Sequence, residues 1–200
     1  MAKPALTRQA YIDTAFDLIS ESGIEKLSMR NVASQLHVSP MAMYKHFPNK
    51  EALLIATLDE VIKRADVYPA MDTPWEQWIE QVARGMFDAL CKESSWVPLL
   101  GSMQLGEQAT VVTQSFVKKM TLEGLSLEQA INVFFAMIQI VIGSVCLQAS
   151  LRQQSSSATA QHAQLPDGMQ AVIGQDQLSI GLPLLMSRIS EQISQSRLSR

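Results

Sequence analysis

Apolar residues recur at helical spacing along most of this 200-residue chain. A C-terminal stripe shows the pattern most clearly, with aliphatic residues at spacings of four, three, four and four: Leu178, Leu182, Leu185, Ile189 and Ile193. Such spacing places side chains on one face of an α-helix. A half-buried strand needs strict alternation instead, and no long segment shows it. The sequence therefore predicts an all-α fold.

Capping residues and chain breakers set the expected helix boundaries. The predicted N-caps of the first four helices are Thr7, Ser28, Ser39 and Asn49. The predicted helices run over about residues 8–22, 28–36, 39–47, 50–64, 75–90, 96–104, 107–122, 126–152 and 178–193. The Ser- and Gln-rich stretch 153–168 is predicted to be a loop.

The segment from Gln129 to Leu151 is 23 residues long and carries no charge, so it could span a bilayer. Polar residues interrupt it, neither end has an aromatic belt, and no second segment of this kind accompanies it. We therefore interpret it as a helix that is buried on all sides within a helical protein, and we expect no membrane partner.

The cysteines and the N-terminus suggest an intracellular setting. Cys91 and Cys146 lie far apart in apolar stretches, so both are predicted to be buried thiols. Charged residues interrupt the N-terminal segment at Arg8, Asp13 and Asp17, and a secretory signal would need an uninterrupted apolar run there. The protein is expected to be cytoplasmic.

Two of the predicted helices, 28–36 and 39–47, are short and are joined by only two residues. This is a helix-turn-helix layout, in which the second helix enters the major groove of DNA and the first crosses the backbone. Small, apolar and cationic residues surround the second helix on all sides. A recognition helix accounts for that mixture, because it buries only a few residues, here Met43 and Phe47, and turns the others toward DNA.

The remaining residues of the second helix carry the chemistry that a DNA groove needs. Small and apolar groups can meet thymine methyl groups, and a cation can meet guanine or phosphate. Hydroxyl and imidazole groups can donate hydrogen bonds to phosphates. The predicted DNA contacts from this segment are Ser39, Pro40, Met41, Ala42, Tyr44, Lys45 and His46.

The charge distribution supports the same segment. The chain has a net charge of -3, yet the window from Lys26 to Lys50 contains four Lys or Arg residues and no Asp or Glu. Residues 51–200 hold 10 basic and 15 acidic side chains. An acid-free window inside an acidic protein indicates where a polyanion could dock.

The stretch "GIEKLSMRNVASQLHVSPMAMYKHFPNKEALL" resembles the DNA-binding domain of the TetR (tetracycline-repressor) family. Its mark is the pattern Tyr-x-His-Phe-x-x-Lys-x-x-Leu, here formed by Tyr44, His46, Phe47, Lys50 and Leu53. "PWEQW" and "GLSLEQAINVFFAMIQIVIGSVCLQ" are similar to the tetracycline-repressor branch. The resemblance implies a three-helix DNA-binding domain over residues 1–50 and a helical ligand-binding and dimerisation domain over 51–200.

The resemblance also implies roles for individual residues. Arg30 is expected to read a base, guanine in the family pattern, and the residues expected to hold phosphates are Thr7, Ser28, Tyr44, His46 and Lys50. Lys50 stands at the start of a predicted helix, where its charge and the backbone N–H groups can serve one phosphate together. His37 departs from the family, which usually has glycine in this turn.

A family member of this kind is a transcriptional regulator, by default a repressor that a small molecule releases from a palindromic operator. The residues suited to a flat apolar or cationic ligand are Trp78, Met86, Trp96, Met103, Phe116, Met120, Phe134 and Met137. The alternative is that these residues are ordinary core. The tetracycline branch uses a metal-coordinating histidine, and no histidine lies between His46 and His162, where the matching region reads "VPLLGSM". The expected inducer is therefore apolar and metal-free, and no cofactor or metal site is expected.

Two helices carry more apolar residues than one small core needs: the helix from Ser126 and the last one. Ala136 and Gly143 lie seven apart on one side and permit close helix approach. We expect a two-fold homodimer with a four-helix interface.

An enzyme is not expected, because the chain has no Gly-rich phosphate loop, no His-Glu-x-x-His and no nucleophile elbow. The alternative function is that of a helical interaction protein that has lost DNA binding.

Overall fold

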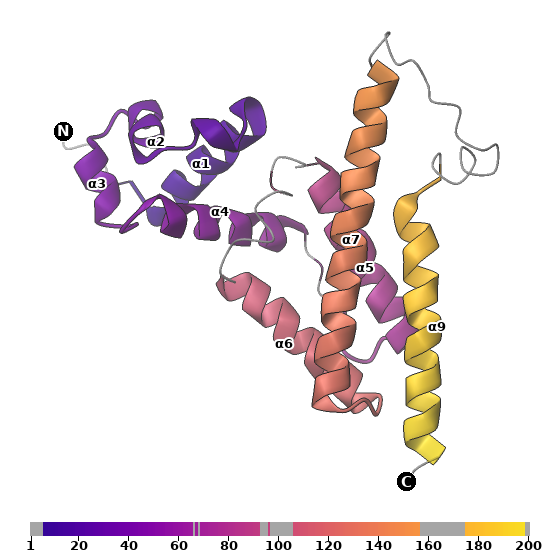
Figure 1. Ribbon diagram of the computed structural model, residues 1–200. Coiled ribbons are helices and arrows are strands. Elements are labelled where there is room, and N and C mark those ends of the chain that lie inside the picture. Colours follow the sequence, from indigo (N-terminus) through magenta and orange to yellow (C-terminus); the bar gives the residue numbers. More distant parts are fainter. Residues whose placement is uncertain are drawn as a thin grey trace. The chain divides into compact units, whose positions relative to one another are not determined.

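The computed structural model describes residues 6–65, 67, 69–92, 96, 106–156 and 175–198. For residues 151–156 it describes the backbone only. All regular structure within these ranges is helical, which confirms the predicted all-α class (Figure 1). The elements are α1 (Arg8–Ser22), η1 (Ile24–Lys26), α2 (Met29–Gln35), α3 (Pro40–Tyr44), α4 (Lys50–Ala65), α5 (Trp75–Lys92), α6 (Glu107–Leu122), α7 (Leu127–Ser156) and α9 (Gln177–Leu198). Residues 97–104 of the predicted helix over 96–104 and residues 157–168 of the predicted loop lie outside the described residues. Residues 153–156, which were predicted to belong to the loop, are part of α7.

Three of the four predicted N-caps form as expected. The side-chain oxygens of Thr7, Ser28 and Asn49 each accept a hydrogen bond from the backbone N–H three residues later, at 3.3, 3.1 and 2.8 Å. A side-chain cap of this kind stabilises a helix by about 1 kcal/mol, because it satisfies a backbone donor that has no partner within the helix. Gly23 ends α1 with a φ of 80°, which glycine adopts without steric cost.

The fourth cap and the length of α3 differ from the prediction. α3 spans only Pro40–Tyr44, and the Ser39 side chain makes no capping hydrogen bond. After Tyr44 the chain tightens into a turn, in which the His46 N–H donates to the Met43 carbonyl oxygen at 2.8 Å. A tight turn of this kind is common at the C-terminus of a helix. Pro48 restricts only Phe47, the residue directly before it, so it does not explain why the helix ends at Tyr44.

Packing divides the chain into two compact units. The first comprises Met1–Arg64 with Ser95–Thr110, and the second Ala65–Ser94 with Val111–Arg200. α4 packs in the first unit, where the Arg64 guanidinium binds the Asp13 carboxylate at 2.6 Å and covers the Phe16 ring at 4.3 Å. The functional boundary expected between residues 50 and 51 stays a prediction, since packing does not identify where DNA binding ends.

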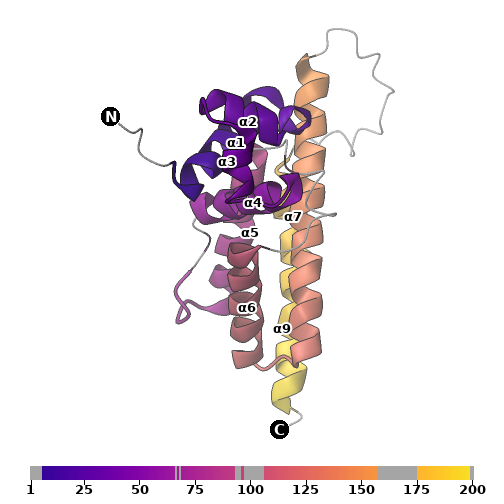
Figure 2. The ribbon, with the colours of Figure 1, turned by 90° about the vertical axis from the view of Figure 1, so that its left-hand side faces the viewer.

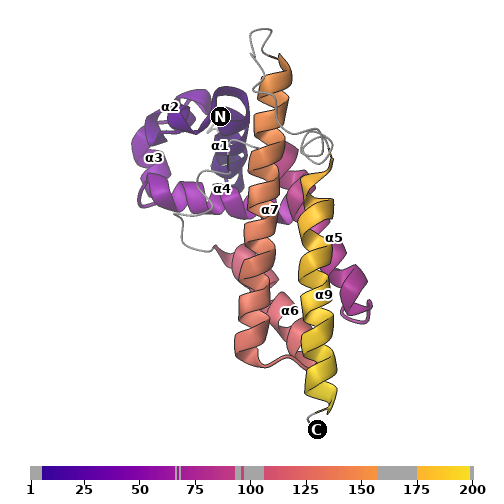
Figure 3. The same ribbon diagram turned by 45° about the vertical axis from the view of Figure 1, so that its right-hand side comes forward.

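In the second unit α5, α7 and α9 pack against one another, and α7 and α9 lie side by side (Figure 3). A Cβ atom at Gly181 of α9 would lie 2.9 Å from Ile140 Cγ2 of α7, so the two helices approach closely there. Within the chain, a Cβ atom at Gly143 would meet nothing within 4 Å. The close approach inside one chain therefore occurs at Gly181, and the role expected for Gly143 at an interface stays a prediction.

α7 is not buried on all sides, contrary to expectation. Its window Leu127–Ser150 has a mean hydropathy of 2.2, is long enough to cross a membrane, and is only 39% buried. Large apolar side chains remain exposed on α7 and α9: Leu127, Ile131, Phe135, Leu147, Leu184 and Leu198. Exposed apolar surface of this kind is typical of an interaction site.

The predicted burial of the cysteines is also wrong. Cys91 on α5 is partly exposed and Cys146 on α7 is exposed. Both lie in apolar stretches of sequence, but neither is fully covered by neighbouring helices. The apolar residues around both cysteines do not indicate which side of these helices is packed and which is exposed.

Candidate DNA-binding surface

Residues of α1, α2, α3 and α4 form a small hydrophobic core beneath the candidate surface. Figure 2 shows these four helices gathered together. Met43 is 0% exposed and Phe47 is 1% exposed, which confirms the prediction that these two residues anchor the recognition helix. The Tyr11 ring of α1 meets Phe47 edge-on at 6.5 Å between centroids. These contacts fix α3 and the turn after it, because they bury the inner side against α1.

The outer side of α3 is exposed. Met41 is 72% exposed, and Tyr44, Pro40 and Lys45 are exposed as well, while Ala42 is half-buried. Packing within the chain does not account for an exposed methionine and tyrosine on a five-residue helix. The arrangement matches a helix that presents its outer residues to a partner.

The turn between α2 and α3 shows how the family difference at His37 is accommodated. His37 has a φ of 54°, in the left-handed region. Its N–H donates to Ser34 O at 3.1 Å and the Val38 N–H donates to Ala33 O at 3.0 Å. This pair of bonds is the Schellman motif that ends a helix, and it normally places glycine at this position. Histidine fills the position because it tolerates left-handed geometry better than most residues other than glycine.

The cations that the sequence singled out are available to a ligand. Lys26, Arg30, Lys45 and Lys50 are exposed, and none forms an ion pair with a carboxylate in the part of the chain that the structure describes. Other basic residues, such as Arg64 and Arg84, are paired with carboxylates. The first unit therefore carries an exposed group of unpaired positive charges around its helix-turn-helix.

Three of the five residues expected to hold phosphates lie at helix starts, while Tyr44 and His46 lie at and just after the end of α3. Thr7 and Ser28 use a side-chain oxygen lone pair for capping, which leaves the hydroxyl proton free to donate. Lys50 is the first residue of α4, beside the capping residue Asn49. His46 is exposed and its ring lies 5.1 Å from the Tyr11 ring, so its orientation is partly fixed.

Arg8 was not among the residues predicted for this surface. Arg8 is exposed at the start of α1, and its guanidinium carbon lies 4.8 Å from the centre of the Phe47 ring. This cation–π contact places a further positive charge beside the anchor of α3. Its position directly after the Thr7 cap was the available signal.

The residues expected to bind a ligand do not all lie together. Buried in the second unit are Trp78, Phe116, Met120, Phe134 and Met137, and Met86 is half-buried. The Phe116 ring lies 5.6 Å from Trp78 and 5.3 Å from Phe134. Trp96 packs in the core of the first unit, and Met103 and the "VPLLGSM" segment lie outside the described residues. The role of this set in ligand binding stays a prediction.

Comparison with known proteins decides the family. Residues 12–57 match the family model described as "Bacterial regulatory proteins, tetR family". This chain carries a DNA-binding domain of the TetR family. The match spans α2, the Schellman turn and α3, together with most of α1 and the first half of α4, so it covers the candidate surface.

Similarity extends beyond the matched segment. The chain is 27% identical to tetracycline repressor protein class D of Escherichia coli over 164 residues, which cover 81% of this chain and 73% of the relative. A TetR variant from Acinetobacter baumannii AYE, solved in complex with minocycline, is 26% identical, with 93% and 97% of the two chains covered and a TM-score of 0.71. The structure of BioQ with its double-stranded DNA operator has 22% identity, 93% and 99% coverage and a TM-score of 0.71, and shows that the fold is shared.

The family settles the general function. The chain is a TetR-family transcriptional regulator with a helix-turn-helix DNA-binding domain, and its relatives are regulators, not enzymes.

Proposed function

We propose that this TetR-family regulator is a homodimeric repressor that binds a palindromic operator and leaves it when a small molecule binds the second unit. The main support is the division of residues on α3. Met43 and the following Phe47 are buried, while Met41, Tyr44 and Lys45 are exposed. A helix that served only the core would not expose this side, so the division favours DNA recognition over a helical interaction protein that has lost DNA binding.

The proposed DNA contacts follow from this exposure. Arg30 is proposed to read a base edge from α2, because a guanidinium can bond guanine through two N–H groups. The groove contacts proposed for α3 are Ser39, Pro40, Met41, Ala42 and Lys45, and the proposed phosphate contacts are Thr7, Ser28, Tyr44, His46 and Lys50. Phosphate contacts position the protein, and base contacts supply sequence preference.

The dimer is proposed from the uncovered apolar surface of α7 and α9. Exposed residues at positions 127, 131 and 135 follow one another at intervals of four, so they line one side of α7. A two-fold axis would bring the same side of a second copy against it, with α7 and α9 of each chain forming four helices. The operator half-sites would then lie about 34 Å apart or a multiple of that distance.

The proposed inducer is a small, largely apolar molecule that needs no metal ion or cofactor. One similar protein was solved with minocycline and another with its DNA operator, which supports both partners for the family. A cytoplasmic regulator is proposed, since operator DNA must be accessible to it.

Replacing Arg30 with alanine should weaken operator binding by about 1 to 3 kcal/mol and relax sequence preference at one position, because a base contact is lost. Replacing Lys50 with alanine should weaken binding to all DNA sequences and reduce the slope of log affinity against log salt by about 1. Fluorescence anisotropy with operator DNA selected from random sequence, at several salt concentrations, measures both effects.

Lys118→Ala is the matched control, because Lys118 is an exposed cation of α6 outside the proposed surface. It should leave the affinity and the salt slope nearly unchanged. If Arg30 and Lys50 behave like Lys118, the proposed DNA surface is wrong and the helical interaction protein becomes the better interpretation.

Tetracycline with magnesium should give no specific binding. The tetracycline branch coordinates the metal through a histidine, and this chain has no histidine between His46 and His162. Isothermal titration calorimetry with tetracycline should show no heat that depends on magnesium. A saturable, magnesium-dependent heat would contradict the proposal of a metal-free inducer.

A further inference from the structure

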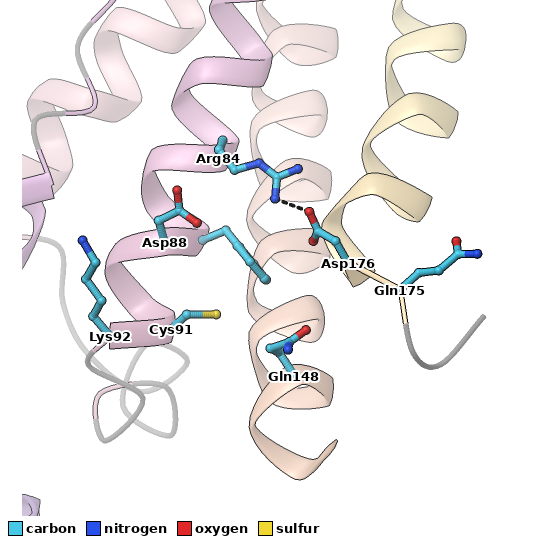
Figure 4. Close-up of a pocket in the computed structure, with 8 residues that line it drawn as sticks. Arg84, Asp88, Cys91, Lys92, Gln148, Gln175 and Asp176 are labelled. Atoms are coloured by element: carbon cyan, nitrogen blue, oxygen red, sulfur yellow. Dashed lines mark hydrogen bonds and ion pairs between the residues drawn. The ribbon is translucent and has the colours of Figure 1, made fainter. Parts of the chain in front are cut away.

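A polar cavity of about 660 Å³ lies in the second unit between α5, α7 and the start of α9 (Figure 4). Its size falls in the range of small-molecule sites, roughly 300 to 1,000 Å³. None of the aromatic and methionine residues expected to bind an apolar ligand lines it. The charged residues that line it are Arg84, Asp88, Lys92 and Asp176, with side-chain amides from Gln148 and Gln175.

One pair of charges forms a wall of the cavity. The Arg84 guanidinium reaches from α5 and donates to Oδ2 of Asp176 at the start of α9, as Figure 4 shows. The other carboxylate oxygen of Asp176 accepts a hydrogen bond from the Leu178 N–H at 3.1 Å. Both oxygens of Asp176 are therefore engaged, and its charge is already balanced by Arg84.

The other pair of charges is not engaged. Asp88 and Lys92 are exposed at the cavity, and neither has a hydrogen-bond or ion-pair partner among the residues described. They lie four residues apart on α5, a separation of about 6 Å along the helix axis. Such a pair often forms a salt bridge on a helix, but here the carboxylate and the ammonium group stay apart.

Among the residues that the structure describes, the cavity therefore offers a negative and a positive group without partners, beside two amide side chains. We infer that it binds a small amphoteric molecule, with its amine against the Asp88 carboxylate and its carboxylate against the Lys92 ammonium group. A molecule with only one charge would satisfy one of these groups and leave the other without a partner. Gln148 and Gln175 can donate and accept, so they suit the neutral polar groups of such a molecule.

This inference goes beyond the proposed function, because it concerns a polar site in the second unit that is separate from the apolar residues proposed above. It also requires no movement of the Arg84–Asp176 pair. That pair holds the start of α9 to α5 and so keeps one side of the cavity fixed.

Four fluorescent compounds with a common dansyl group test the inference by titration of the full-length protein. They are Nε-dansyl-lysine, which carries an amine and a carboxylate; dansylcadaverine, which carries only an amine; dansyl-aminohexanoate, which carries only a carboxylate; and uncharged dansylamide. Nε-dansyl-lysine is expected to bind roughly tenfold more tightly than either singly charged compound, since partly exposed ion pairs contribute modestly. Equal affinity for the four compounds, or no binding, would overturn the inference.

Two substitutions test which residue binds each charged group of the ligand. Asp88→Asn should remove the preference for Nε-dansyl-lysine over the carboxylate-only compound, and Lys92→Gln should remove its preference over the amine-only compound. Glu80→Gln on α5 and Lys118→Gln on α6 are matched controls, because both residues are exposed and lie outside the cavity lining. Unchanged preferences in the Asp88 and Lys92 variants would overturn the inference.

A measurement of operator binding distinguishes failure of the amphoteric site from failure of the proposed function. Asp88→Asn and Lys92→Gln, measured without any dansyl compound, should bind operator DNA like the unmodified protein. A protein that binds its operator but does not distinguish the four compounds would overturn the amphoteric site alone.

Discussion

Replacing Phe47 with alanine is expected to lower the free energy of unfolding of the first unit by about 3 to 5 kcal/mol, the usual cost of removing a buried phenylalanine ring. The ring is 1% exposed, meets Tyr11 edge-on and lies under the Arg8 guanidinium. Its loss leaves a cavity beneath the turn after α3. Operator affinity should fall below detection, because the recognition helix loses its anchor. Urea denaturation followed by circular dichroism, together with fluorescence anisotropy, measures both effects.

Met41→Ala is the matched control on the same helix. Met41 is 72% exposed, so its replacement should change the free energy of unfolding by less than about 0.5 kcal/mol. It should still weaken operator binding if Met41 meets a base edge. A Phe47 variant that kept its stability and its operator affinity would show that this core does not hold the recognition helix in place.

Replacing both Phe135 and Leu147 with aspartate is expected to convert the proposed dimer to monomers at micromolar concentration. Phe135 is 55% exposed and Leu147 is also exposed on α7. In a two-fold interface each substitution occurs twice, so four carboxylates would enter an apolar contact without partners. Operator affinity should fall by a factor of at least about 100, because two linked DNA-binding domains bind far more tightly than one. Sedimentation velocity gives the oligomeric state.

Leu122→Asp is the control for this experiment. Leu122 is 69% exposed, but it lies at the end of α6 and not on α7 or α9. This variant should remain a dimer and keep its operator affinity. If the double variant also remained dimeric, the interface would have to lie on another surface.

Local features were predictable because their causes lie within a few residues. The caps at Thr7, Ser28 and Asn49 form as expected, since each oxygen meets an N–H three residues later. The burial of Met43 and Phe47 was also predictable from the mixed composition of the recognition helix. The length of α3 was overestimated, because the helix ends in a turn well before Pro48.

Features that depend on distant residues were not predictable. The long apolar run of α7 gave no indication of which side would pack, and the helix proved to be only 39% buried. Trp96 was grouped with Trp78 by composition, yet the two residues lie in the cores of different units. Side-chain type shows that a residue can be buried, but not which residues will surround it.

The sequence by itself determined the helical class, the helix-turn-helix and the burial of Met43 and Phe47 beside the exposed residues of α3, because capping, spacing and charge act over short stretches of chain. Only the tertiary structure decided how much of α7 stays uncovered and that Arg84 and Asp176, 92 positions apart, close one wall of a polar cavity beside Asp88 and Lys92. The physical reason is that such neighbours are set by helix packing, in which residues remote in sequence approach through surfaces that no local pattern identifies.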